Sequence, residues 1–379
     1  MTLSVSRREI LGCSGGVAVG LTVGAIAGAE LTSRPVAIAH GRDEAPKSGF
    51  VRLLFNENPY GPPESAKQAI RDAIDGSWMY SHQDVRQLRD VIAEREGLRP
   101  ENVIVTEGSG ELLKIAGLVL GGGREVVSAT PSFTMLADYV IRNAGRVEAV
   151  ALDSELGIDL SAMADHVNER TGVVYICNPN NPTGAILNPA YLRSFIGAVS
   201  PRAAIIVDEA YIDFTDEPQK NSMVDQIKAG MNVVVSRTFS KVYGMAGLRI
   251  GYGLGRPDVI NRLEQRRISI PNRLGVLAAL ASYEDKNFVA SSREMVRSSI
   301  DQTYKFLDEM SLRYVPTQGN FIFFDTGRPA VDFYRHMRSR NVLVAPRPDY
   351  LETWARVSIG RSEDMDSFAE AARSFFQKT

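Results

Sequence analysis

Residues 232–255, NVVVSRTFSKVYGMAGLRIGYGLG, join a short β-branched run to a glycine-rich segment that holds a single lysine, Lys241. The run at 232–236 has the residue types of a strand, and polar residues follow it directly. Two similar runs lie upstream: GVVYIC (172–177) leads into NPNNPTG, and AAIIV (203–207) leads into DEAYIDF. All three runs are almost continuously apolar, which is typical of parallel strands that are covered on both faces.

Helix-like stretches alternate with such runs from Val51 onward, and this alternation indicates an α/β fold. Open α/β sheets bind ligands beyond the carboxyl ends of their strands. The three runs therefore bring four polar side chains to one rim: Asn181, Asp208, Tyr211 and Lys241. Each has a plainer explanation when it is taken alone. Asp208 can cap a helix, NPTG can be a simple turn, and Lys241 can be a solvated surface lysine. Their joint occurrence favours a binding site.

A fourth strand-like run, 103–106, turns through Gly108, Ser109 and Gly110 into a helix that we expect to begin near Glu111. Backbone N–H groups at a helix start form a site for anions. The dinucleotide fingerprint is not met, because Leu113 stands where the third glycine is required. A phosphate-binding loop remains the functional interpretation of this turn.

The composition narrows the classes of partner. The 379 residues suffice for two domains, and the 44% hydrophobic and 23% charged contents are those of an ordinary soluble protein. The net charge of −2 and the scattered basic residues do not favour nucleic acid. The two cysteines, Cys13 and Cys177, exclude a disulfide framework, and no histidine has metal-ligand spacing. We therefore expect neither a nucleic-acid partner nor a metal.

The N-terminal stretch SRREILGCSGGVAVGLTVGAIAGA places Arg7 and Arg8 ahead of an apolar run rich in glycine and alanine. Ala25 to Ala27 supply the small-x-small pattern of a cleavage site. The pattern predicts a twin-arginine signal peptide over 1–29, followed by a polar linker over 30–50, and hence export to the periplasm by the Tat machinery. An uncleaved membrane anchor is the alternative, although six glycines weaken it. If the signal is not used, the protein stays in the cytoplasm.

A single ligand could use the phosphate site, the carboxylate, the phenol, the amide and the lysine together. Lysine forms Schiff bases with carbonyl compounds, and pyridoxal 5′-phosphate carries an aldehyde, a pyridine nitrogen, a phenolic oxygen and a phosphate. Asp208 can pair with the ring nitrogen, while Asn181 and Tyr211 can bind the phenolic oxygen. Phe133, in TPSFTML, can stack on the ring, although alone it would be a core residue. The expected phosphate ligands are Thr238, Ser240, Arg249 and the amides around Ser109 and Gly110.

Over residues 51–376 the chain resembles the fold-type I pyridoxal-phosphate aminotransferases, and within them the histidinol-phosphate aminotransferase-like group. The matching motifs are NENPYGPP (56–63), NPNNPTG (178–184), DEAYIDF (208–214), RTFSKVYGMAGLRIGY (237–252) and RVSIG (356–360). The resemblance implies an aspartate aminotransferase-like α/β fold, with a mixed, mostly parallel sheet flanked by helices and a smaller α+β domain. It also implies the domain limits: an arm over 51–61 that joins the small domain, a large cofactor-binding domain over 62–257, and a small domain over 258–379.

The same resemblance implies roles for single residues. Lys241 bonds the cofactor covalently, Arg249 binds its phosphate, and Arg356 grips the α-carboxylate of the substrate. Tyr60 belongs to the substrate site. Tyr80, in WMYSHQD, matches a tyrosine that reaches the phosphate of the neighbouring subunit, so a homodimer with shared active sites is expected.

The implied activity is a ping-pong transfer of an amino group from an amino acid, or an amine like histidinol phosphate, to a 2-oxo acid. Residues 344–360 lack a clean match to the arginine that binds the substrate phosphate in true histidinol-phosphate enzymes, although Arg347 is nearby. Export would also be unusual for an enzyme of histidine synthesis. Other chemistry on the same cofactor (racemase, lyase, decarboxylase or oxidase) and a non-catalytic binding protein remain the alternatives.

Overall fold

The structure is a computed structural model that describes residues 49–345 and 351–377. The expected signal peptide, nearly all of the expected linker, and Arg347 lie outside these residues. Within the two described ranges, no helix is long and apolar enough to cross a membrane. The same ranges contain no group of three or more histidine, cysteine, aspartate or glutamate residues that could hold a metal ion.

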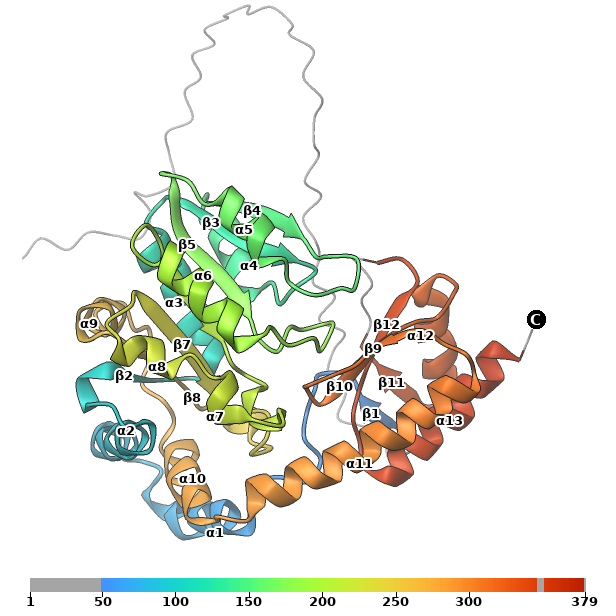
Figure 1. Cartoon of the computed structure of the whole chain (residues 1–379). Coiled ribbons are helices and arrows are strands. Elements are labelled where there is room, and N and C mark those ends of the chain that lie inside the picture. The colour runs from blue at the N-terminus through green and yellow to red at the C-terminus, as the bar shows by residue number, and fades with distance from the viewer. Residues whose placement is uncertain (1–48, 346–350, 378–379) are drawn as a thin grey trace, which may run out of the picture. The chain divides into compact units, whose positions relative to one another are not determined.

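A seven-stranded sheet forms the centre of the larger part of the fold, in the order β2-β8-β7-β6-β5-β3-β4 (Figure 1). β8 runs antiparallel to both of its neighbours, and the remaining pairs are parallel. The expected mixed, mostly parallel sheet is confirmed. The strands are β2 (Val103–Thr106), β3 (Glu125–Thr130), β4 (Arg146–Ala151), β5 (Thr171–Cys177), β6 (Ala204–Asp208), β7 (Val233–Thr238) and β8 (Gly251–Gly255).

The three apolar runs of the sequence form β5, β6 and β7, which are neighbours in the sheet. Every residue of β5 and β6 is buried, as expected of strands that are covered on both faces. Their register aligns Cys177 with Asp208, and Asp208 with Ser236. The carboxyl ends of the three strands therefore meet at one edge, which confirms the expected rim.

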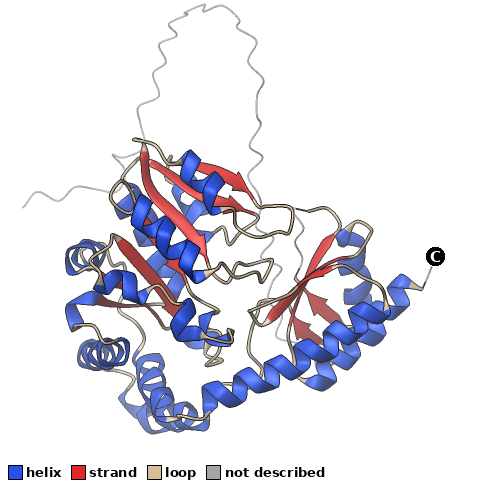
Figure 2. Cartoon of the chain, viewed as in Figure 1, coloured by secondary structure: helices blue, strands red, loops and turns tan. Residues whose placement is uncertain are grey.

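Helices cover both faces of this sheet (Figure 2). One face packs against α3 (Ser109–Gly121), α4 (Met135–Arg142) and α9 (Pro257–Glu264). The other face packs against α2 (His82–Glu96), α5 (Leu160–His166), α6 (Pro189–Val199) and α8 (Val224–Lys228). Successive residues of a strand serve opposite faces, so Tyr175 of β5 faces the α3 side and Ile176 faces the other. The helix after β2 begins at Ser109, two residues before the expected position.

The second sheet is antiparallel, in the order β12-β10-β9, and is built from β9 (Tyr314–Val315), β10 (Phe321–Asp325) and β12 (Trp354–Ser358). Beside it, β1 (Val51–Leu53) pairs in parallel with β11 (Val342–Val344). The long helix α11 (Phe288–Glu309) lies alongside α13 (Ser362–Phe376), and α12 (Ala330–Ser339) packs near them (Figure 1). The remaining helices are α1 (Glu64–Ala73), α7 (Pro218–Asn221) and α10 (Arg273–Glu284), of which α1 packs on α10.

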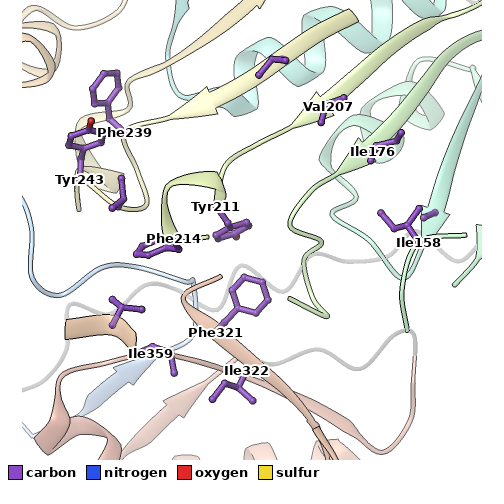
Figure 3. Close-up of a cluster of buried hydrophobic side chains, with 14 of the residues drawn as sticks. Ile158, Ile176, Val207, Tyr211, Phe214, Phe239, Tyr243, Phe321, Ile322 and Ile359 are labelled. Atoms are coloured by element: carbon purple, nitrogen blue, oxygen red, sulfur yellow. The ribbon is translucent and has the colours of Figure 1, made fainter. Parts of the chain in front are cut away.

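The two sheets meet through aromatic side chains. Tyr211, which follows β6, contacts Phe321 at the start of β10 edge-to-face, with 5.0 Å between the ring centroids (Figure 3). Both rings are buried. This contact brings the rim of the large sheet against the small sheet, and the predicted site residues lie around it.

Candidate active site

Asp208 ends β6 and is 2% exposed. The Tyr175 hydroxyl donates a hydrogen bond of 3.0 Å to its Oδ2 atom. Its Oδ1 atom is buried and has no hydrogen-bond partner among the described residues. Burial raises the pKa of Asp208 to about 6, although the bond from Tyr175, the Ser236 hydroxyl and the Ala210 N–H oppose the shift. Neither the Ser236 hydroxyl nor the Ala210 N–H reaches Oδ1 with the geometry of a hydrogen bond. A buried carboxylate oxygen that lacks a donor fits the protonated nitrogen of a pyridine ring.

The helix-cap explanation of Asp208 is wrong. The next helical turn, Ile212–Phe214, begins four residues later and has Tyr211 at its N-cap. The Asp208 carboxylate therefore does not cap a helix.

Asn181 links two other predicted residues. Its Oδ1 atom accepts a hydrogen bond of 2.6 Å from Nη1 of Arg356, and its Nδ2 atom donates to the Tyr211 hydroxyl over 3.4 Å. Burial raises the pKa of Tyr211, so the phenol keeps its proton. Residues from three separate motifs thus form one hydrogen-bonded chain beside Asp208.

The Lys241 side chain lies beside Tyr211. Its Nζ atom donates to the carbonyl oxygens of Phe55 and Asn56, over 2.9 and 3.0 Å. It also lies 5.4 Å from the ring centroid of Tyr211. Burial and the positive charge of Arg356 lower the pKa of Lys241 to about 7, against the opposing charges of Glu57 and Asp208. An amine that loses its proton near neutral pH can attack an aldehyde.

The predicted phosphate ligands come together at the start of α3. The Thr238 hydroxyl donates to Oγ of Ser240 over 2.9 Å, and Nη1 of Arg249 donates to the same oxygen over 3.4 Å. Gly108 precedes the helix with a φ of 70°, and a Cβ atom there would collide with the guanidinium of Arg249. The N–H groups of Ser109 and Gly110 open the helix beside these side chains, which makes the cluster an anion site. We call these six residues the phosphate cup.

The other three predicted residues are Phe133, Tyr60 and Tyr80. Phe133 is half-buried and packs against the core on the α3 face, while the neighbouring Ser132 donates to Oδ1 of Asn180 over 2.7 Å. Tyr60 packs against the main core, and its N–H donates to Oδ1 of Asn58. Tyr80 is 83% exposed, and its ring lies near that of His82.

Three buried side chains of the site, those of Tyr175, Asn56 and Asn320, were not among the residues predicted from the sequence. Tyr175 supports Asp208, as described above. Asn56 donates from Nδ2 to the Tyr211 hydroxyl over 3.0 Å. Asn320 donates to the carbonyl oxygen of Asn56 over 3.1 Å. Asn56 belongs to the quoted motif NENPYGPP, so a signal was present, but its partners lie far along the chain.

Together these groups offer an amine, an unpaired carboxylate oxygen, a phenol with an amide, and an anion cup, which is the set of contacts that pyridoxal 5′-phosphate requires. Comparison with known proteins agrees. Residues 48–371 match the family described as aminotransferase class I and II. The chain belongs to this family. A relative, the histidinol-phosphate aminotransferase of Moorella thermoacetica, is 37% identical to this aminotransferase over 328 residues, which cover 85% of this chain and 84% of the relative.

Solved structures resemble the aminotransferase along most of its length. One is the histidinol-phosphate aminotransferase of Sinorhizobium meliloti in complex with pyridoxal 5′-phosphate, with a TM-score of 0.78 and 28% identity over 86% of this chain and 92% of that one. Another is a double mutant of the aspartate aminotransferase of Thermus thermophilus, with a TM-score of 0.74 and 26% identity over 86% and 91%. The expected fold, that of aspartate aminotransferase, is confirmed.

The aminotransferase uses pyridoxal 5′-phosphate and catalyses transamination. When bound, this cofactor supplies an electron sink for the carbon atom that carries the amino group. The expected cofactor and reaction class are both confirmed, and so is the expected membership of the histidinol-phosphate aminotransferase-like group.

Proposed function

We propose that the aminotransferase exchanges the amino group of an α-amino acid with a 2-oxo acid by ping-pong chemistry, and that Arg356 binds the α-carboxylate. The half-buried guanidinium of Arg356 carries this proposal. No carboxylate of the described residues pairs with it; its two Nη atoms donate to Asn181 and to the Leu54 carbonyl, and Nε has no acceptor there. A buried charge without a counter-ion is costly. A planar substrate carboxylate would supply that counter-ion.

The contacts of the side chains and the resemblance to the family support the other roles in this proposal. We assign Lys241 to the cofactor aldehyde and, when its amine is free, to the proton on the substrate Cα. Asp208 holds the ring nitrogen through its unpaired Oδ1, Tyr211 and Asn181 hold the phenolic oxygen, and the phosphate cup holds the phosphate. Phe133 would stack on the ring, and Tyr60 would line the substrate side.

A panel of amino acids tests the reaction. The purified protein should form 2-oxo acids, and the visible absorbance of its cofactor should change with the productive amino acids. Arg356→Lys keeps the charge but loses the planar fork. The activation free energy that corresponds to kcat/KM should therefore rise by about 2–4 kcal/mol, while cofactor binding stays unchanged. Arg193→Lys is the matched control, because Arg193 forms a similar two-armed pair with Asp225 away from the site. Wild-type efficiency in Arg356→Lys would remove Arg356 from the carboxylate role.

Histidinol phosphate is the second candidate for the amino donor, because the relative from Moorella thermoacetica bears that name and is 37% identical. This amine carries a phosphate and no α-carboxylate, so it needs a second cation. Arg347 is the nearby candidate in the sequence. Including histidinol phosphate in the panel separates the two donors, and Arg347→Ala should then weaken only the phosphate-bearing one.

We also propose that the aminotransferase is a homodimer in which Tyr80 serves the neighbouring site. Tyr80 and Trp78 are 83% and 82% exposed. Large aromatic side chains at such exposure are typical of an interaction surface, and a second copy that covers them would place the Tyr80 hydroxyl near a phosphate cup.

Finally, we propose export of the folded, cofactor-loaded protein through the twin-arginine route. The pair Arg7-Arg8 ahead of the apolar run supports this route. Replacing both arginines with lysine should leave the cofactor-bound precursor inside the cell, as measured by fractionation and immunoblotting. Unchanged export would rule out this route.

A further inference from the structure

Asn56 is buried at 1% exposure and has a φ of 53°, a left-handed conformation that asparagine tolerates better than most residues. Its N–H donates to Oγ of Ser358 over 2.7 Å, and that hydroxyl donates back to Oδ1 of Asn56 over 3.0 Å. The pair of bonds orients the amide: the oxygen faces Ser358, and the nitrogen faces Tyr211. Ser358 itself lies two residues beyond Arg356 on β12.

The Tyr211 hydroxyl oxygen accepts two hydrogen bonds, from Nδ2 of Asn56 over 3.0 Å and from Nδ2 of Asn181 over 3.4 Å. The side-chain amide of Asn181 cannot flip, because its oxygen already accepts a hydrogen bond from Arg356. An amide nitrogen only donates, so both lone pairs of the phenol oxygen are occupied. The hydroxyl proton must therefore find a third partner, and none of the described residues accepts it. The phenol ring faces Lys241, on the cofactor side.

We propose that Asn56 is a positioning residue for the reaction. By filling one lone pair of the Tyr211 oxygen, and by being held in that orientation by Ser358, it directs the Tyr211 proton toward the phenolic oxygen of bound pyridoxal 5′-phosphate. The backbone of Asn56 adds a second function, because its carbonyl oxygen accepts from Lys241. The inference does not depend on which amine is the substrate.

Asn56→Asp tests the role of the side chain. Aspartate keeps the tolerance for a left-handed backbone and the acceptor for Ser358, but it offers Tyr211 an acceptor in place of a donor. The Tyr211 proton then turns toward the introduced carboxylate. A donor to the phenolic oxygen stabilises the deprotonated form of the bound cofactor, so the midpoint pH of its visible absorbance change should rise. Catalytic efficiency should fall by about tenfold to a hundredfold, the factor for a hydrogen bond to a charged group.

A double-mutant cycle separates positioning from a general disturbance. In a Tyr211→Phe background, Asn56→Asp should move the absorbance midpoint much less than it does in the wild type, because no hydroxyl proton is left to redirect. Ser358→Ala should shift the midpoint in the same direction by freeing the amide. Asn102→Asp is the matched control: Asn102 is buried and donates from Nδ2 to the Gly255 carbonyl, far from the site.

Asn56→Gly keeps the left-handed backbone and the carbonyl that accepts from Lys241 while removing the amide. It decides the question if Asn56→Asp does not fold. An unchanged absorbance midpoint in a folded Asn56→Asp or Asn56→Gly variant would overturn the proposal, and so would a full shift that persists in the Tyr211→Phe background. The absorbance is read without any amino acid, so this result is independent of the substrate assignment.

Discussion

Lys241 and Asp208 carry pKa values that the fold shifts in opposite directions. Burial lowers the pKa of Lys241 to about 7 and raises the pKa of Asp208 to about 6. In both cases burial is the largest cause, because it disfavours the charged form of each group. Arg356 adds to the shift at Lys241. Both groups therefore titrate close to neutral pH, which is typical of reactive positions.

The lowered pKa of Lys241 predicts its reactivity in the cofactor-free protein. The amine is charged below about pH 7 and neutral above it, whereas an ordinary lysine stays charged up to about 10.5. Labelling of Lys241 by an amine-reactive reagent should therefore rise with a midpoint near pH 7, as measured by peptide mass spectrometry. Arg356→Leu should raise this midpoint. The exposed Lys220 provides the reference within the same sample, and a Lys241 that labels in parallel with it would contradict the prediction.

The ends of β6 and β7 and the start of α3 hold these residues in place. Behind the rim, Glu209 is fully buried and pairs with Arg237 over 2.9 Å. Glu209 follows Asp208 directly, and Arg237 precedes Thr238, so this ion pair ties the end of β6 to the end of β7. In front, Gly108 lets the chain turn from β2 into α3 and leaves space for Arg249. The phosphate cup thus depends on a backbone that only glycine adopts at low cost.

Gly108→Ala should weaken cofactor binding. The new Cβ atom collides with the Arg249 guanidinium, and the left-handed backbone adds about 1 kcal/mol of strain. We expect the dissociation constant of pyridoxal 5′-phosphate, measured by titrating the cofactor-free protein, to rise about tenfold or more. Gly230→Ala is the control, since Gly230 has a φ of 79° and open space around it. It should lose stability without losing affinity; equal affinity losses in the two variants would show that the collision is unimportant.

At the scale of the whole molecule, the site draws side chains from both sheets and from the first described segment of the chain. Asp208 ends β6 and Lys241 follows β7 of the large sheet, Arg356 and Ser358 lie on β12 of the small one, and Asn56 follows β1. Their contacts lie within one chain. The proposed exception is Tyr80, whose exposed ring would serve the site of a second copy.

The proposed dimer can be tested by sedimentation and by removing the hydroxyl group of Tyr80. Sedimentation should show a dimer at working concentrations, and Tyr80→Phe should remain dimeric. Its dissociation constant for the cofactor should rise about tenfold, because a hydrogen bond to a charged phosphate is lost. Tyr191→Phe removes a comparably exposed hydroxyl from α6 and should leave affinity unchanged. A monomeric protein with full cofactor affinity would contradict the shared site.

Local patterns predicted the features that local chemistry determines. The β-branched runs marked β5, β6 and β7, and their polar ends marked Asn181, Asp208, Tyr211 and Lys241, because strand burial and the edge of a sheet follow from residue type and order. The start of α3 was predicted two residues late, since glycine and serine are weak helix formers that nonetheless serve at a helix N-terminus.

The supporting side chains could not be predicted in the same way. Tyr175 looks like one more apolar residue of β5, and its bond to Asp208 depends on the register between two strands. Asn56 meets Ser358 across 302 positions of sequence. A long-range pairing of this kind is set by tertiary packing and leaves no periodicity to detect.

The pairing of β1 with β11 also fixes an order of events during synthesis. Val51 emerges from the ribosome early, and its partner Val342 emerges near the end. Until then Leu54, Phe55 and Asn56 have no strand to anchor them, and bringing such distant segments together carries an entropic cost that local contacts do not. The rim of the large sheet and the phosphate cup can be complete while the rest of the chain is still being made. Phe55 and Asn56, whose carbonyl oxygens accept from Lys241, are therefore anchored only after β11 has been made, so the catalytic geometry is completed late in synthesis.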